Sequence, residues 1–342
     1  MKRLASKTRL AVLACLCLSV AFSAATVRAA PKLVEARKIW SKANHNAFTD
    51  LIRFRGKWYC SFREGSGHVS ADGAVRIIRS EDGKKWSSAA HMTSERADLR
   101  DPKMCVTPDG KLMVTAAAAL GERASGGHRC VVWTSSDGSE WSDMKWMDAE
   151  KNMWLWRVTW HQDTAHSVGY RTGGDERFVR LYSSSDGVHY DTLVPRLFEK
   201  GYPNEATLRF LKDDRCLCVL RRDGPRDNPT AQLGISRPPY EDWTWKDLGT
   251  RIGGPDFTRL PDGRFVVAAR LYDGGTRTSL LWLDPEEGTL DEFVELPSGG
   301  DTSYPGLVWR EGELWVSYYS SHEGRTSIYL ARVAFPGVSV ER

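Results

Sequence analysis

Apolar and polar residues alternate along this chain in short runs, and the runs come in pairs separated by a tight turn. Residues 215–220 alternate with the period of two that a β-strand requires, and a turn at residues 210–214 precedes them. Residues 202–221 therefore predict a hairpin that holds Glu205 and Arg221 near the same end. Bulky aromatic and β-branched residues punctuated by 30 Gly and 15 Pro favour β-structure throughout.

The same unit, a polar residue followed by a strand, a turn and a second strand, recurs six times at intervals of about 50 residues. A third strand follows each hairpin. The six hairpins begin at Asp50, Asp101, Arg157, Glu205, Asp256 and Tyr304.

A second motif marks the third strands. Residues 80–86, 135–141 and 184–190 all follow the formula S-x-D-G-x-x-W/Y. The formula predicts a tight turn with Gly at positive φ, in which the Ser and Asp side chains bond the turn's own amides and the aromatic residue pins the hairpin.

Four strands per repeat, six times, predict an all-β fold, a six-bladed β-propeller. Residues 32–40 are expected to complete the last blade. The six leading polar residues are then expected to ring one mouth of the central channel. Two separate β-domains are the competing layout, but nothing between the third and fourth repeats resembles a linker.

The first thirty residues differ from the rest. A basic start, an apolar stretch over residues 10–25 and a small-residue exit near Ala29 are typical of a secretory signal. We therefore divide the chain into a signal peptide, residues 1–30, and a propeller, residues 31–342, and expect export to the periplasm or the medium. No other segment is apolar over the ~18 residues that a membrane span requires.

Charge and composition exclude other classes of partner. The net charge of +4 comes from 48 basic and 44 acidic residues without a lysine-rich run, so we expect no nucleic-acid binding. Five Cys residues remain after the signal, an odd number that argues against a disulfide framework. Cys216 and Cys218 are expected in the core, and His45 and His68 in ordinary loops. No metal and no organic cofactor is implied, and we expect a monomer.

The three S-x-D-G-x-x-W/Y turns resemble the Asp-box of the sialidase (neuraminidase) superfamily, whose fold is a six-bladed propeller, and the resemblance covers residues 32–342. Asn204-Glu205, followed sixteen residues later by Arg221, is similar to the segment that bears the family's glutamate base and a carboxylate-binding arginine. Arg277 looks like a further arginine of that set, and Tyr304 looks like the family's nucleophile. The resemblance also implies a general acid ahead of the first Asp-box, where Asp72 is the positional match.

Physical chemistry agrees with these roles. Sialic acid carries a carboxylate on its anomeric carbon, which guanidinium groups bind through paired hydrogen bonds. That carboxylate would repel an anionic nucleophile, which explains a neutral tyrosine activated by a glutamate base.

The first repeat departs from the family pattern, because Ala47 stands where an arginine is usual. Arg63 or Arg100 could supply a substitute guanidinium. Asp50 and Asp101 are extra carboxylates that could bind hydroxyl groups or take over the acid role. The substrate contacts expected from the sequence are therefore Arg221, Arg277, Arg63, Arg100, Asp101, Asp50 and Asp256.

The function expected is a secreted, sialidase-like exo-glycosidase that releases a terminal sialic acid or a related acidic sugar from a glycan, with retention, through Tyr304. Two alternatives stay open: a glycan-binding propeller without catalysis, and a propeller enzyme that acts on a polysaccharide containing uronic acid.

Overall fold

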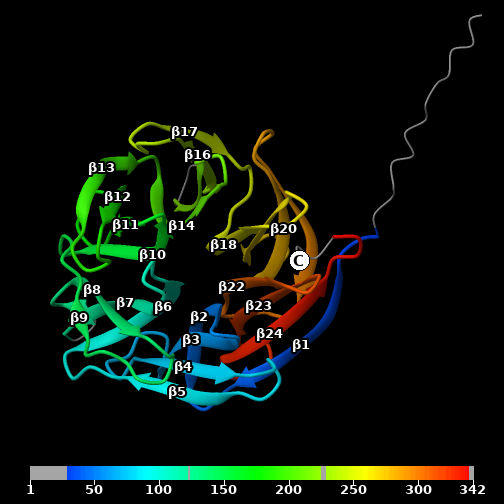
Figure 1. The fold of residues 1–342 in the computed structure, drawn as a ribbon, viewed down its shortest axis with the longest axis horizontal. Helices are drawn as coiled ribbons and strands as arrows, with labels where there is room; N and C mark the ends of the chain where they lie inside the picture. The colour runs from blue at the N-terminus through cyan, green and yellow to red at the C-terminus, as the bar shows by residue number, and fades with distance from the viewer. Residues whose placement is uncertain (1–28, 122–123, 225–228, 339–342) are drawn as a thin grey trace, which may run out of the picture.

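In a computed structural model of the protein, which describes residues 29–121, 124–224 and 229–338, six antiparallel sheets of four strands surround a central channel (Figure 1). The predicted six-bladed β-propeller is confirmed. The innermost strands β2, β6, β10, β14, β18 and β22 line the channel; we call the end of the channel where these strands begin the mouth and the opposite end the far face.

The strands follow chain order within the blades, with one exception that closes the ring. Blade 1 contains β2 (His45–Phe54), β3 (Lys57–Gly65), β4 (Ala74–Ser80) and β5 (Ser87–Met92), and blade 2 contains β6 (Ala97–Val106), β7 (Leu112–Leu120), β8 (His128–Ser135) and β9 (Lys145–Trp146). Blade 3 contains β10 (Met153–His161), β11 (Thr164–Arg171), β12 (Val179–Ser184) and β13 (Asp191–Phe198), and blade 4 contains β14 (Tyr202–Phe210), β15 (Cys216–Asp223), β16 (Gln232–Ser236) and β17 (Trp243–Asp247). Blade 5 contains β18 (Gly253–Arg259), β19 (Phe265–Leu271), β20 (Arg277–Asp284) and β21 (Thr289–Leu296), and blade 6 contains β22 (Thr302–Arg310), β23 (Glu313–Ser320), β24 (Ser327–Ala334) and β1 (Lys32–Trp40).

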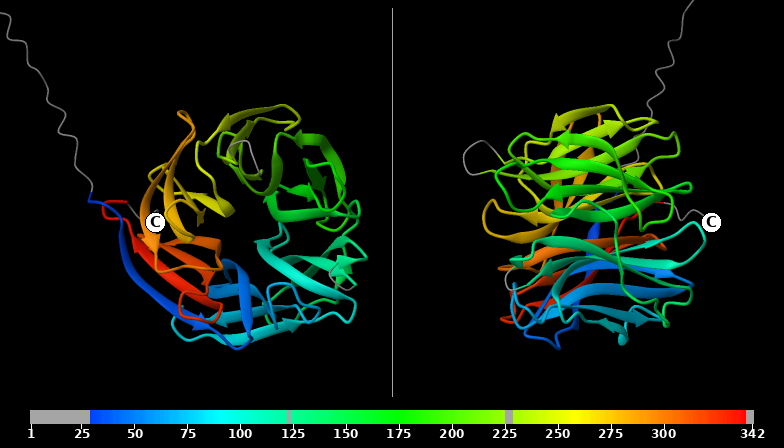
Figure 2. Two further views of the ribbon diagram at one scale, coloured as in Figure 1. Left: turned by 180° about the vertical axis from the view of Figure 1, so that it is seen from behind. Right: turned by 90° about the vertical axis from the view of Figure 1, so that its left-hand side faces the viewer.

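The first strand of the chain completes the last blade. β1 pairs antiparallel with β24, from Lys32 opposite Ala334 to Trp40 opposite Ile328. Figure 2 shows these two strands, one blue and one red, side by side in the same blade. The N-terminal strand thus supplies the outer strand of blade 6, and its hydrogen bonds to β24 close the ring.

The core lies in layers between neighbouring blades. In β15, Cys216 and Cys218 pack with residues of blade 3, whereas Leu217 and Val219, on the other face, pack with residues of blade 5. Both faces of a blade are covered, so both sets of alternating residues are buried. All five cysteines after residue 30 are free thiols, and Cys216 and Cys218 occupy the core as predicted.

The S-x-D-G turns have the predicted geometry. Ser135 Oγ donates to Asp137 Oδ1 at 3.1 Å, and the same oxygen accepts the backbone N–H groups two and three residues later at 2.8 and 2.9 Å. Gly138 has φ of 77°, where residues with a Cβ are strained. The turns at residues 80–86 and 184–190 repeat this arrangement.

These turns also join the blades to one another. The glycine of each turn lies against a large side chain on the second strand of the preceding blade, where any Cβ would collide with it. The three contacts are Gly83 on Trp315, Gly138 on Tyr59 and Gly187 on Met113.

A β-bulge occurs at the same place in all six inner strands. Between two paired positions near the mouth, each inner strand has one residue more than its partner strand. A bulge reverses the direction of the side chains that follow it. The bulged pairs are Phe48-Thr49, Asp101-Pro102, Trp156-Arg157, Asn204-Glu205, Gly254-Pro255 and Tyr304-Pro305.

Among the described residues, no helix is long and apolar enough to cross a membrane. Residues 1–28 of the predicted signal segment (residues 1–30) lie outside the part of the chain that the structure describes, and the description begins at Ala29, next to the expected cleavage point.

We predict that Gly138→Ala lowers the free energy of unfolding by about 2–4 kcal/mol, because the new Cβ would combine positive φ with overpacking against Tyr59. Gly110→Ala is the matched control, since Gly110 has φ of 76° and no neighbouring atom within 4 Å. It should cost only the backbone strain, about 1 kcal/mol. Urea denaturation of both variants measures the difference, and equal losses would show that the contact between blades contributes nothing.

Candidate functional site

The bulges sort the six leading polar residues into different positions. Asp101 and Tyr304 are the first residues of their bulges and Glu205 is the second, and these three side chains interact at the mouth. Asp50 and Asp256 follow their bulges and lie deeper in the channel. The expectation that all six residues form one ring at the mouth is therefore wrong, because the bulge shifts the side chains that follow it in each inner strand.

The centre of the mouth holds a hydrogen-bonded group from blades 4 and 6. Tyr304 Oη donates to Glu205 Oε1 at 2.5 Å, and Arg221 Nη1 donates to Glu205 Oε2 at 2.8 Å and to Tyr304 Oη at 3.2 Å. The backbone N–H of Gly254 adds a bond to Glu205 Oε2 at 2.8 Å. The structure thus brings together three residues that are up to 99 positions apart in the chain.

The Tyr304 ring is held on all sides. Phe48 and Trp156 contact it edge-on, with centroids 5.2 and 5.5 Å away. A Cβ on Gly254 would lie 2.8 Å from the ring, so only glycine lets the ring approach this backbone. Tyr304 itself has φ of 52°, a conformation that L-residues rarely adopt and that surrounding structure must enforce.

Burial and then the Glu205 carboxylate raise the pKa of the Tyr304 phenol well above its ordinary value, against the opposing effect of Arg221 and Arg270. The phenol is therefore protonated at neutral pH and donates to Glu205. Removal of that proton to Glu205 would leave an oxygen nucleophile beside a guanidinium, an arrangement suited to covalent attack.

Asp101 is a second carboxyl group at the mouth, and it is nearly unpaired. Its side chain is buried, its Oδ1 has no hydrogen-bond partner, and its nearest cation, Arg100 Nε, is 3.9 Å from Oδ2. Burial raises the pKa of Asp101 from 3.8 to about 6. A carboxyl group with a raised pKa and a free oxygen has the properties of a general acid.

Beneath the mouth lies a layer of buried charges. Arg157 Nη1 bonds both oxygens of Asp50 at 3.0 and 2.9 Å, and its Nη2 lies 3.5 Å from Asp256. Lys103 Nζ donates to the backbone oxygen of Thr49 at 3.0 Å, within the same layer. Asp50 and Asp256, expected as substrate contacts, are thus engaged in ion pairs that link blades 1, 3 and 5.

The predicted arginines divide into engaged and available groups. Arg63 is fully buried, bonds Asp98 at 2.7 Å and holds its own loop through Gly67 and Ser70. Arg277 forms a two-pronged ion pair with Glu292, at 3.0 and 2.6 Å. The guanidinium groups of Arg63 and Arg277 are therefore engaged in hydrogen bonds and ion pairs within the protein.

Arg270, which was not among the predicted site residues, lies beside Tyr304. Its guanidinium lies 5.4 Å from the centroid of the Tyr304 ring and bonds Tyr319 Oη at 2.8 Å. The sequence contained the signal, because the fifth repeat ends at Arg270 as the fourth ends at Arg221. The Arg100 guanidinium lies 5.3 Å from the centroid of the Phe48 ring, and its Nη1 donates to Asp98 Oδ2 at 3.4 Å.

Asp72 lies away from this group. It is exposed, and both of its oxygens bond the backbone N–H of Ser66, at 3.1 and 3.0 Å, within one loop. Hydrogen bonds from Ser70 and Ser66 lower the pKa of Asp72, the opposite of what a general acid needs.

Several buried polar atoms at the mouth lack a protein partner. Such atoms are rare in folded proteins and mark places where water or a ligand binds. They come from blades 2, 3 and 4 and are Arg100 Nε, Asp101 Oδ1, Trp156 Nε1 and Arg221 Nε.

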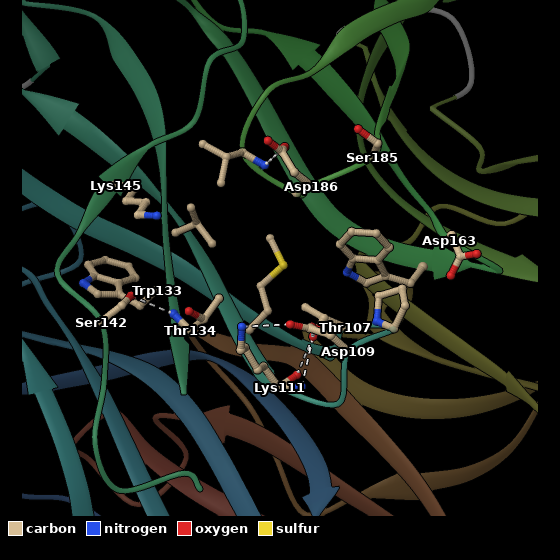
Figure 3. Close-up of a pocket in the computed structure, with 16 residues that line it drawn as sticks. Thr107, Asp109, Lys111, Trp133, Thr134, Ser142, Lys145, Asp163, Ser185 and Asp186 are labelled. Carbon is tan, nitrogen blue, oxygen red and sulfur yellow. Dashed lines mark hydrogen bonds and ion pairs between the residues drawn. The ribbon is translucent and has the colours of Figure 1, made fainter. Parts of the chain in front are cut away.

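A separate cavity of about 400 Å³ lies between blades 2 and 3, where inner strands end (Figure 3). Its polar groups are mostly satisfied within their own turns: Thr107 bonds Asp109 at 2.5 Å, and Asp186 bonds the N–H of Val188 at 2.7 Å. We therefore place the candidate site at the mouth and not in this cavity.

Comparisons with known proteins agree with the fold. No protein-family model and no curated protein sequence matches the chain. Among solved structures, it is similar to a protein of unknown function from Dyadobacter fermentans, with 19% identity over 89% of this chain and 99% of that one and a TM-score of 0.78. It is also similar to the GH93 α-L-arabinofuranosidase of Fusarium graminearum with arabinobiose, with 13% identity over 88% and 98% of the two chains and a TM-score of 0.69.

A third similar structure is Trypanosoma rangeli sialidase in complex with the inhibitor DANA, with 14% identity and a TM-score of 0.64. The match covers 85% of this chain and 55% of the sialidase chain, so the chain spans about half the length of that protein. At these identities the likenesses show the propeller fold, and the chemistry has to be argued from the mouth.

We predict that Asp101 makes the protein less stable as pH rises from 4 to 7. Folding raises the pKa of this carboxyl, so the folded state binds its proton more tightly, and that stabilisation is lost as pH rises through about 6. Asp101→Asn removes the effect, so its stability relative to wild type should improve by about 2–3 kcal/mol between pH 4 and pH 7. Urea denaturation at both pH values measures this.

Asp72→Asn is the contrasting control, because the pKa of Asp72 is lowered and its contribution is present at pH 7 and lost in acid. That variant should lose stability relative to wild type at the higher pH. A stability difference between Asp101→Asn and wild type that does not change with pH would contradict the assignment.

Proposed function

We propose that the protein is an exo-acting glycoside hydrolase that removes a terminal acidic sugar with retention of configuration. The observation that carries the proposal is the contact of Tyr304 Oη with both Glu205 and Arg221 at the mouth of the channel. The similar structures named above as an arabinofuranosidase and a sialidase place carbohydrate-acting proteins on the same fold.

The reaction proceeds in two steps. In the first, Tyr304 Oη attacks the anomeric carbon, its proton passes to Glu205, and the bond to the leaving oxygen breaks as Asp101 protonates that oxygen. In the second, water attacks the anomeric carbon, Asp101 takes a proton from the water, and Tyr304 leaves and recovers its proton from Glu205. Two displacements on one carbon give net retention.

Arg221 and Arg270 favour a substrate with a carboxylate on or beside the anomeric carbon. Both guanidinium groups contact Tyr304, and the Arg100 guanidinium lies 5.3 Å from the centroid of the Phe48 ring, which itself contacts Tyr304. Paired hydrogen bonds from guanidinium groups to a carboxylate are strong and directional. Ala47 stands where the sialidase family usually has an arginine, so that position carries no positive charge. Arg100 is the residue that can supply a guanidinium group in its place.

We predict that Tyr304→Phe and Glu205→Gln both reduce kcat/KM on an aryl α-sialoside by about three orders of magnitude or more, since each removes part of the nucleophile. Release of the fluorophore is the measurement. Tyr240→Phe is the matched control, because the Tyr240 hydroxyl bonds a backbone oxygen at the far face and should leave activity unchanged.

Full activity of Tyr304→Phe on any glycoside would overturn the mechanism. If the protein hydrolysed an aryl α-L-arabinofuranoside but not the sialoside, the proposed acidic substrate would be wrong, whereas the proposal of a glycoside hydrolase would stand. Binding of sialylated glycans without any turnover by the wild type would favour a binding propeller.

The general acid can be tested separately. Asp101→Asn should lower kcat/KM by about 10²–10⁴-fold on a glycan, whose leaving oxygen needs a proton. The loss should be much smaller on a dinitrophenyl glycoside, whose leaving group needs none. Asp72→Asn is the comparison variant, and a dependence on the leaving group in that variant instead of Asp101→Asn would assign the acid to Asp72.

A further inference from the structure

Three side chains converge beside the candidate site, at the junction of blades 1 and 6. His45 Nε2 and His68 Nδ1 lie 3.0 and 2.8 Å from the same oxygen, Asp301 Oδ2. These three atoms all lie within 4.8 Å of one another. Residues from three separate parts of the chain thus direct two nitrogens and one oxygen at a single point.

The geometry points to a binding site for a divalent transition metal ion of the zinc class: we propose that His45, His68 and Asp301 are its protein ligands. Two atoms that bind one ion at about 2.0–2.1 Å lie roughly 3 Å from each other, as the two nitrogens do from the oxygen here. Imidazole nitrogen selects zinc, copper or nickel, whereas calcium and magnesium prefer oxygen ligands.

The surrounding residues hold the ligands in place. Tyr319 donates to Asp301 Oδ1 at 2.8 Å, which leaves Oδ2 to the two histidines. Hydrogen bonds of this kind orient ligating carboxylates in known metal sites. Tyr319 also accepts a bond from Arg270, so the proposed ion is connected to the mouth through one hydroxyl group.

Hydrogen bonds of Arg63 and Asp72 fix the loop that carries His68. Arg63 bonds the backbone oxygen of Gly67 at 2.8 Å and that of Ser70 at 3.2 Å, on either side of His68. Asp72 closes the same loop through Ser66. A metal site needs such support, because its ligands must be held within about 0.5 Å of the binding geometry.

Three protein ligands would leave a fourth position for water or a substrate oxygen, as in zinc sites that are not purely structural. The His68 side chain is 51% exposed, so solvent reaches the cluster. The ion would also join blade 1 to the residue that precedes β22, close to the point where the ring closes.

The test is metal binding by the full chain, made without a histidine tag and dialysed against a chelator. Titration with zinc chloride, followed by calorimetry and by elemental analysis, should give one ion per chain. Cobalt(II) should produce visible absorption bands of a nitrogen- and oxygen-ligated ion, and zinc should raise the melting temperature.

His68→Ala should weaken zinc binding by at least ten-fold, and its exposed side chain makes misfolding no concern. Asp301→Asn should do the same. The matched control is His189→Ala: His189 lies 2.7 Å from Asp186 in an exposed pair, and among the described residues no third potential ligand joins this pair, so its loss should change nothing. Equal zinc affinity in wild type and His68→Ala, or less than one ion per wild-type chain, would overturn the proposal and leave a hydrogen-bonded network.

Discussion

The bulge near the start of every inner strand is the constraint on which the site depends. It inserts one extra residue at the same level in all six blades, and four of the first bulged residues have positive φ: Phe48, Asp101, Gly254 and Tyr304. Without the bulge, the alternation of an inner strand would be uninterrupted from mouth to far face. With it, Tyr304 and Asp101 reach the mouth while later residues of the same strands point into the layers between blades.

The charged layer under the mouth is the second consequence. Arg157, Asp50 and Asp256 come from alternate blades and meet across the channel. Buried ion pairs contribute little net stability, because desolvation offsets their attraction. Their effect is to fill the channel with fixed charges and so to give the site a rigid, polar floor. The phenol of Tyr304 and the carboxyl of Asp101 lie above that floor, where burial raises the pKa of both groups.

The mouth, and not the fold, distinguishes the chemistry of this protein. The same propeller occurs in an arabinofuranosidase and in a sialidase, so the fold by itself does not identify a substrate. In this chain, Arg221 and Arg270 contact the tyrosine, Ala47 leaves one expected cation out, and a histidine pair with Asp301 adjoins them. This combination makes an acidic sugar the substrate class to test first and makes the ion site the feature to test independently of catalysis.

The sequence alone determined the fold, because each repeat carries its own local signals: alternation with period two, Asp-Gly turns, and about 50 residues per unit. It also predicted that Glu205 and Arg221 lie close together, since both belong to one hairpin. Tyr304 was identified as a candidate through the resemblance to the sialidase family. Tertiary structure decided the rest. Arg270, and not Arg277, lies beside the Tyr304 ring, Arg277 is paired with Glu292, and Arg63 bonds Asp98 and its own loop. The sequence pattern does not contain the partner that each guanidinium group meets in the folded chain. The bulge, which leaves no mark in the pattern of residues, decided which carboxyl groups reach the mouth and which lie buried beneath it.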